Sequence, residues 1–135
     1  MATIKISKSE LKKHVKVDED TIEKINMFGA PVESQTADEI ELEIMPNRPD
    51  LLSTQGFIRA FKAFLGKDTG LTKYRIHSPE KNFKVKIDSS VSEVRPYTAC
   101  AIVKKLKLDD EKIKNLIDLQ EKLHTTVGRN RKKAA

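Results

Sequence analysis

The strongest constraint in the sequence is an alternating run, residues 39–44, that is followed at once by two closely spaced prolines. Apolar side chains at every second position are typical of a strand with one face buried and the other in water. The apolar positions are Ile40, Leu42 and Ile44, and glutamates separate them. Pro46 and Pro49 restrict their own backbone and that of the preceding residue. The chain is therefore expected to leave this strand through a rigid corner.

We interpret this corner as a structural joint. It consists of Asn47, Arg48, Pro49 and Asp50. After it, Asp50 or Ser53 is placed to cap a helix, and Gly56 permits another backbone to approach closely. A second interpretation stays open, in which Arg48 reaches an acidic partner or a phosphate.

The helix after the joint is predicted by three phenylalanines. Phe57, Phe61 and Phe64 recur at spacings of four and three, which places their rings on one helical face. We expect these rings to lie in the core and the helix to end at Gly66.

Two short helices are predicted to open the chain. Ser7 and Glu10 fit a capping box, in which each side chain bonds a free backbone N–H of the other residue. The first helix is therefore expected to start near Lys8. The second is expected to begin at the acidic group 18–20, which suits the positive end of the helix dipole, and to stop at Gly29.

The second half of the sequence predicts a connector, two strands and a long helix, so the expected fold class is α+β. Residues 67–82 lack a long periodic pattern and are interpreted as the connector. Residues 83–87 alternate between apolar side chains and lysine, as in a half-buried strand. Residues 97–103 are nearly all apolar, as in a strand covered on both faces. Cys100, within this second strand, is expected to be buried and structural.

The last helix is expected to begin at Asp109 or Asp110 and to end at Gly128. At helical spacing its apolar face consists of Ile113, Leu116, Ile117, Leu123 and Val127. Gln120 and His124 fall near the centre of that face and are predicted to point inward, with Glu121 beside it. Buried polar groups need partners, so the backbone, each other, a ligand or water must satisfy them.

Length and composition limit the class of protein. The chain has 135 residues, enough for one ordinary domain or for one small domain and part of another. No apolar run approaches the ~20 residues of a membrane span, and the N-terminus lacks the apolar core of a secretory signal. A single cysteine excludes an internal disulfide. We therefore expect no membrane association and a location in the reducing cytoplasm.

The positive charge is concentrated late in the sequence. Residues 1–103 hold 16 basic and 15 acidic side chains, whereas residues 104–135 contribute +5. The chain ends in a cluster that consists of Arg129, Arg131, Lys132 and Lys133. Such a cluster suits phosphate backbones through counterion release. The alternative is a solvated basic end that binds nothing.

Three separated motifs together resemble one known family. The run EIELEIMPNRPDLLSTQGFIRAFKAFLG, then VRPYTACAIV, then the stretch containing LQEKLH, are similar to the β chain of phenylalanine tRNA synthetase in its archaeal and eukaryotic form. The resemblance covers nearly everything from the first helix to residue 135, and the combination of NRPDLLS, RPY and LQEKLH is highly specific.

The resemblance implies two domains. Residues 1–80 would form the N-terminal helix-and-strand domain of the family, with a fold similar to a winged helix. Residues 81–135 would open an α/β editing domain, which removes tyrosine wrongly attached to the phenylalanine tRNA. In the family, ATP and magnesium are used on the α chain, so the resemblance implies no cofactor in this chain, and the sequence contains no metal-ligand cluster or glycine-rich phosphate loop.

The resemblance also implies a partial editing site. Carried over by position, its residues are Gln120, Glu121 and Arg131. A glutamine can orient a water or a carbonyl, a glutamate can accept a proton, and an arginine can stabilise negative charge or hold the terminal nucleotide. His124 is not carried over.

The implied partners are the α chain, the remainder of the β chain and the phenylalanine tRNA, in a heterotetramer. Because family members continue well beyond residue 135, the chain is expected to be either a fragment or a free-standing relative, and to show negligible editing alone. One alternative is a small free-standing, non-catalytic nucleic-acid-binding module. Another is a chain that binds only protein partners.

Overall fold

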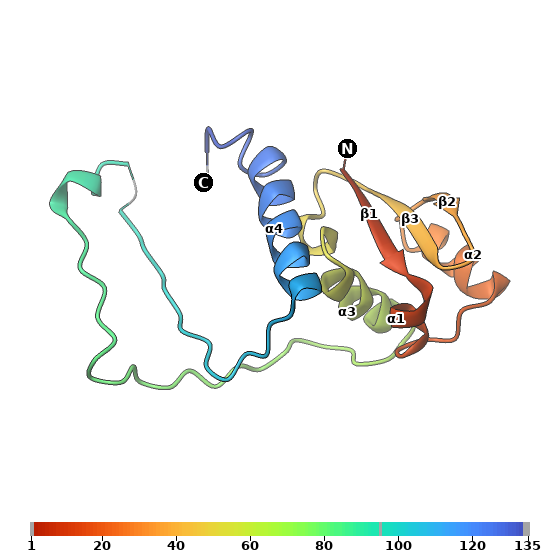
Figure 1. Cartoon of the computed structure of the whole chain (residues 1–135), viewed down its shortest axis with the longest axis horizontal. Coiled ribbons are helices and arrows are strands. Elements are labelled where there is room, and N and C mark those ends of the chain that lie inside the picture. The colour runs from red at the N-terminus through yellow and green to blue at the C-terminus, as the bar shows by residue number, and fades with distance from the viewer. Residues whose placement is uncertain (1, 95, 134–135) are drawn as a thin grey trace. The chain divides into compact units, whose positions relative to one another are not determined.

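The computed structural model describes residues 2–94 and 96–133, so Arg95 of the RPY motif lies outside the described residues. The chain divides into two compact units: Met1–Leu71 together with Asp109–Ala135, and Thr72–Leu108. Helices and an antiparallel sheet occur together in the first unit (Figure 1). This mixture confirms the α+β fold class. The proposed domain boundary near residue 80 stays a prediction.

Three antiparallel strands form the sheet of the first unit. They are β1 (Ala2–Ser7), β2 (Val32–Gln35) and β3 (Glu39–Ile44), in the order β1-β3-β2. β3 has the predicted bounds and the predicted inner face, because its three apolar side chains are at most 1% exposed. In β1, Ile4 lies opposite Leu42 and Ile6 opposite Ile40, so both strands contribute apolar pairs to one buried face.

Helices α1 (Lys8–Lys12), α2 (Glu19–Met27) and α3 (Thr54–Phe64) supply the rest of the core. Phe57 and Phe61 are fully buried, as predicted, whereas Phe64 is 45% exposed. The ring of Phe28 packs edge-on against those of Phe57 and Phe61, with centroids 5.8 and 5.7 Å away. Such edge-to-face contacts are favourable beyond the area they bury. The aromatic cluster therefore ties α3 to the residue that ends α2.

The two opening helices form at the predicted places. Asp18 accepts the backbone N–H of Thr21 at 3.0 Å and so caps α2. The capping box of α1 is wrong, since Ser7 makes no side-chain cap and instead lies 2.7 Å from the Ser9 hydroxyl. The carboxylate of Glu10 accepts from Lys13 at 2.5 Å. Ser7 is the last residue of β1, so strand pairing sets the start of α1.

The second unit contains no strand within its described residues, and its regular structure there is one short 3₁₀ helix, η2 (Ser89–Val91). The predictions of strands at 83–87 and 97–103 are therefore wrong. The prediction that Cys100 is buried is also wrong, because its side chain is exposed. Val85 is 59% and Ile102 62% exposed. A strand requires a hydrogen-bonded neighbour, and the described residues of this unit make no such ladder.

Residues 2–94 and 96–133 contain neither a membrane-spanning helix nor a cluster of metal-binding side chains. No helix there is long and apolar enough to cross a membrane. Within the same ranges, no group of three or more His, Cys, Asp or Glu side chains is placed to hold a metal ion.

Candidate functional site

The joint after β3 is held together by its own side chains. The Arg48 guanidinium donates to both carboxylate oxygens of Asp50, at 3.0 and 2.8 Å, and lies 5.4 Å from the Phe28 ring centroid. The hydrogen bonds from Arg48 lower the pKa of the Asp50 carboxyl. Arg48 is thus engaged within the chain, while Asn47 is exposed. A short 3₁₀ helix, η1 (Pro49–Leu51), completes the corner.

The start of α3 lies directly against this joint. Ser53 caps the helix by accepting the backbone N–H of Gly56 at 3.1 Å, so of the two predicted candidates Ser53 is the cap. A Cβ on Gly56 would lie 2.1 Å from the carbonyl oxygen of Asp50. This is the close backbone approach that the glycine was predicted to permit.

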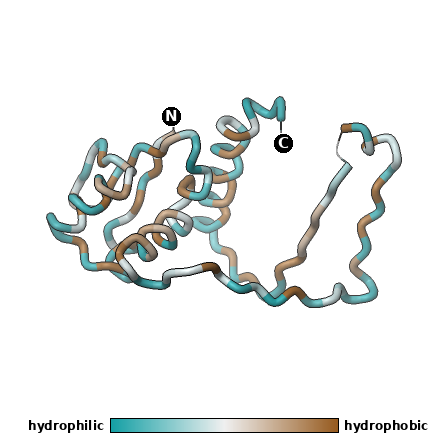
Figure 2. The backbone as a smooth tube through the Cα atoms, turned by 180° about the vertical axis from the view of Figure 1, so that it is seen from behind, coloured by the Kyte–Doolittle hydropathy of each residue, from teal (hydrophilic) through white to brown (hydrophobic). Residues whose placement is uncertain are grey.

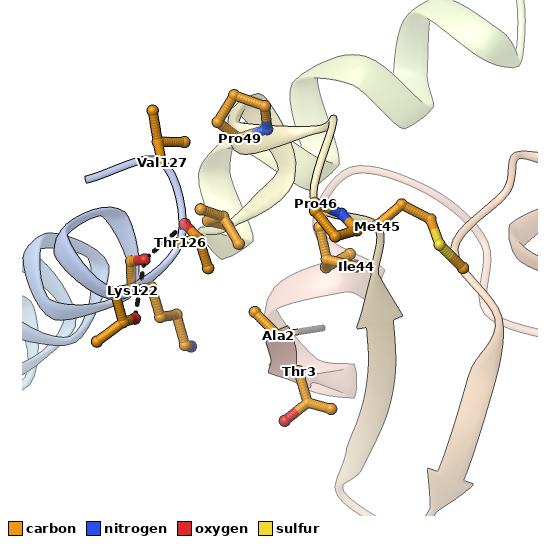
Figure 3. A pocket seen from close by; sticks show the side chains of 11 residues that line it. Ala2, Thr3, Ile44, Met45, Pro46, Pro49, Lys122, Thr126 and Val127 are labelled. Carbon is orange, nitrogen blue, oxygen red and sulfur yellow. Dashed lines mark hydrogen bonds between the residues drawn. The ribbon is translucent and has the colours of Figure 1, made fainter. Parts of the chain in front are cut away.

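A cleft of about 510 Å³ lies between the joint, the adjoining ends of β1 and β3, and the last turn of α4 (Asp110–Thr125). Figure 3 shows Pro46 and Pro49 on one side and Thr126 and Val127 on the other. Among the described residues that line it, Lys122 is the one ionisable side chain, and Asp118 pairs with it at 2.6 Å. The cleft is therefore mostly apolar and holds no free acid or base.

Helix α4 has the predicted start but not the predicted orientation. Asp109 caps it by accepting the backbone N–H of Lys112 at 2.9 Å. Leu119 is the α4 side chain that packs against the core. The predicted apolar face is exposed instead, with Ile117 60% and Leu116 54% accessible. Since the helix contacts the core of its unit through a different face, the prediction that Gln120 points inward is also wrong.

Two of the three proposed editing residues are in contact. The Arg131 guanidinium donates to the carboxylate of Glu121 at 2.5 Å, with both side chains about half exposed. Gln120, one residue earlier, is exposed. His124 is half buried, and its Nδ1 is a buried atom with no hydrogen-bond partner among the described residues. The side chains of Gln120, Glu121 and Arg131 are thus open to a ligand.

A turn in the left-handed region returns the chain to α4. Arg129, Asn130 and Arg131 have φ values of +48°, +53° and +64°. This conformation is energetically unfavourable for residues that carry a Cβ atom. The backbone N–H of Arg131 donates to the carbonyl of His124 at 3.0 Å, and that of Gly128 to Leu123 at 2.8 Å. The turn thereby brings Arg131 to Glu121, which sequence reasoning did not foresee. Of the basic cluster, Arg129, Lys132 and Lys133 are exposed.

No protein-family model matches the chain, but individual relatives do. It is 39% identical over 136 residues to the phenylalanine–tRNA ligase β subunit of Methanococcoides burtonii. Identity to the same subunit is 42% over 142 residues in Methanocaldococcus jannaschii and 43% over 136 residues in Sulfolobus acidocaldarius. Each of these matches includes the whole chain.

A solved structure has the same fold. It is an N-terminal fragment of the phenylalanyl-tRNA synthetase β subunit of Pyrococcus horikoshii, with a TM-score of 0.77 and 30% identity over 96% of this chain. The chain is homologous to the N-terminal part of the phenylalanine–tRNA ligase β subunit. This confirms the family resemblance drawn from the three motifs. The chain spans about a quarter of the length of the β subunits it matches and 39% of the solved fragment.

Proposed function

We propose that the chain acts as the N-terminal part of the β subunit of a phenylalanine–tRNA ligase, the enzyme that attaches phenylalanine to its tRNA. Its role there is architectural, and it supplies one edge of a site that hydrolyses tyrosine from mischarged tRNA. The observation that carries the proposal is homology along the whole chain to β subunits of that name. The partners are then the α chain, the remaining β-subunit domains and the phenylalanine tRNA. ATP and magnesium act on the α chain, in the cytoplasm.

The proposed hydrolytic edge consists of Gln120, Glu121 and Arg131. The Glu121 carboxylate would position or deprotonate the attacking water. Arg131, which holds that carboxylate at 2.5 Å, would stabilise negative charge at the ester or the terminal nucleotide. The exposed amide of Gln120 would orient the water or the carbonyl. All three side chains reach solvent in this chain, and the remainder of the β chain would supply the other walls of such a pocket.

The joint explains how the architectural role is performed. The Arg48–Asp50 pair, the prolines and the contact between Gly56 and Asp50 fix the direction in which α3 leaves the sheet. A fixed direction is what a domain needs if it is to present other domains in a constant geometry.

A chimera tests the proposal. Residues 1–135 replace the matching part of the M. jannaschii β subunit, which is 42% identical, and the chimera is produced with the M. jannaschii α chain. We expect it to assemble, to charge phenylalanine tRNA at a rate close to that of the parent, and to release tyrosine from mischarged tRNA. An assembled chimera that charges tRNA but releases no tyrosine would refute the hydrolytic role. Failure to assemble would refute the architectural role, provided that the isolated chain folds.

The isolated chain provides the complementary test. Because only one edge of the pocket is present, we expect tyrosyl-tRNA to be hydrolysed by the chain alone no faster than in buffer. Appreciable release of tyrosine would contradict this expectation.

A further inference from the structure

The contact between Glu121 and Arg131 consists of one hydrogen bond among the described residues. Nη2 of the Arg131 guanidinium donates to Oε2 of Glu121 at 2.5 Å. A second arginine pair of the same unit is different, because Arg48 donates from two nitrogens to both carboxylate oxygens of Asp50 and also lies over the ring of Phe28. A two-point contact between arginine and a carboxylate is stronger and more directional than a one-point contact. Arg131 is therefore the more easily displaced of the two arginines.

The backbone around Arg131 is held independently of this pair. Its N–H donates to the carbonyl of His124 at 3.0 Å, and the N–H of Lys133 donates to the carbonyl of Gly128 at 2.9 Å. The side chains of Glu121 and Arg131 are both about half exposed, and an ion pair in that setting is weak because water screens it. The Arg131 side chain can therefore rotate away from Glu121 while its Cα atom stays in place.

The surroundings of Arg131 favour an anion that carries more charge than a carboxylate. Arg129, Lys132 and Lys133 lie within two residues of it, and all three are exposed. Figure 2 shows that the segment leading to the C-terminus is hydrophilic. A phosphate offers more acceptor oxygens and more negative charge than a carboxylate, and it matches the fork of the guanidinium. A phosphate group therefore competes with Glu121 for Arg131.

We propose that Glu121 and Arg131 form an exchangeable ion pair, which opens when a phosphate group takes the guanidinium and thereby frees the carboxylate oxygen that Arg131 occupies. The phosphate belongs to a nucleotide or is a free phosphate ion, since a guanidinium recognises the same group in both. One consequence rests on the proposed function. If Glu121 activates a water, its second oxygen becomes available only after the ligand has bound, so hydrolysis follows the seating of the ligand.

A permanent brace is the alternative, in which Glu121 orients Arg131 for the ligand and stays bound to it. A guanidinium has more N–H donors than one carboxylate uses, so simultaneous binding of both anions is the arrangement to exclude. The two alternatives predict opposite effects of removing the carboxylate. Because an exchangeable partner competes with phosphate, Glu121→Gln strengthens phosphate binding. Because a brace orients the arginine, the same substitution weakens it.

The test measures binding of adenosine monophosphate and of inorganic phosphate to the whole 135-residue chain, at an ionic strength kept constant with sodium chloride. Glu121→Gln is compared with the parent and with Asp118→Asn. This control removes the same charge from the same helix, where Asp118 pairs with Lys122 at 2.6 Å. Glu121→Gln should bind both ligands about three- to fivefold more tightly, as expected when a half-exposed ion pair is removed, and Asp118→Asn within about 1.5-fold of the parent.

Four outcomes of this comparison would overturn the proposal. Weaker binding by Glu121→Gln would establish the brace. Equal tightening in both variants would mean that only net charge matters. Unchanged binding by Glu121→Gln would show that no competition exists, and a parent chain that binds neither ligand would lack the exchange altogether. Saturation at a lower concentration of adenosine monophosphate than of phosphate would assign the group to a nucleotide. Equal concentrations would assign it to phosphate alone, and both results support the exchange.

The chemical shift of the Glu121 carboxyl carbon reports the exchange directly. Saturation with phosphate should move it to the value found in Arg131→Gln, in which the pair is absent, and should leave the Asp118 carboxyl carbon unchanged. A Glu121 shift that stays constant while phosphate binds would contradict the proposal. All three substituted side chains are exposed, so the unfolding transitions of the variants should coincide with that of the parent.

Neither measurement depends on hydrolysis, so failure of the exchange is distinct from failure of the proposed function. Undiminished release of tyrosine by a Glu121→Gln chimera would refute the hydrolytic edge and would leave the exchange in place. Weaker phosphate binding by the Glu121→Gln chain would refute the exchange and would leave the hydrolytic edge in place.

Discussion

The guanidinium of Arg131 donates to the carboxylate of Glu121 across a turn whose three central residues all have positive φ. Ten residues of sequence separate the two groups, and the hydrogen bond from Arg131 to the carbonyl of His124 holds the chain in position for the contact. A half-exposed ion pair contributes at most about 1 kcal/mol. The strained turn is therefore not maintained by the ion pair alone, which agrees with a role in placing Arg131.

Asn130 lies at the centre of this turn, with φ of +53°. Replacing it with valine should destabilise the turn by about 1 to 2 kcal/mol, because a β-branched residue is strongly disfavoured there. The variant Asn130→Gly should be as stable as the parent. Chemical shifts of the Arg131 side chain report the contact with Glu121, and we expect the valine variant to lose it. Retention of the contact in Asn130→Val would show that the left-handed turn is not required.

Gly56 allows α3 to lie against the joint. A methyl group there would meet the Asp50 carbonyl oxygen at 2.1 Å, so Gly56→Ala should cost at least about 2 kcal/mol, in the range of overpacked cores. The exposed neighbour provides the control, since Gln55→Ala should change the free energy of unfolding by less than about 0.5 kcal/mol. Urea denaturation measures both. Equal stability of the two variants would contradict the tight approach.

Phe61 and Phe64 should differ in importance although both lie on the predicted aromatic stripe. Phe61 is fully buried and Phe64 is 45% exposed, so Phe61→Ala should cost about 3 to 5 kcal/mol and Phe64→Ala less than half as much. Urea denaturation again measures the free energy of unfolding of both variants. Similar losses would show that Phe64 is as much a part of the core as Phe61.

Asp18 should make stability depend on pH. Hydrogen bonds from Lys16 and Thr21 lower the pKa of this carboxyl to about 2 from its ordinary 3.8. A lowered pKa stabilises the folded state above the ordinary value, and that stabilisation is lost as pH falls from about 4 to 2. Asp18→Asn keeps a capping side chain without the charge, so its unfolding midpoint should fall less steeply over that interval. If the unfolding midpoints of parent and variant fall equally with pH over that interval, Asp18 is not the source of the pH dependence.

The elements predicted correctly are those whose signal is local. Strict alternation predicts β3, and phenylalanines at helical spacing predict α3. The acidic group 18–20 predicts the start of α2, and its first residue, Asp18, accepts the backbone N–H only three residues later. β1 was missed because the capping-box pattern at Ser7 competed with the shorter alternation of Ile4 and Ile6. β2 was missed because three of its four residues are exposed and a bulge interrupts its pairing.

The errors concern features that depend on distant residues. The apolar runs 83–87 and 97–103 have strand-like composition, yet a strand exists only where another strand pairs with it. The orientation of α4 was wrong for a related reason. Its apolar stripe predicts a buried face, but the helix touches the core through Leu119 on another face. The residues of the candidate site were identified from the family resemblance. The contact between Glu121 and Arg131 could be found only from the folded structure.

The most direct test of the account is the rate of tyrosine release from mischarged tRNA by the chimera that carries Glu121→Gln. Glu111→Gln, on the same exposed helix, is the matched control. We predict at least a hundredfold loss for Glu121→Gln, as expected when a general base is removed. Charging with phenylalanine should be unchanged, and the control should retain full release. Undiminished release of tyrosine by the Glu121→Gln chimera would contradict the proposed hydrolytic edge.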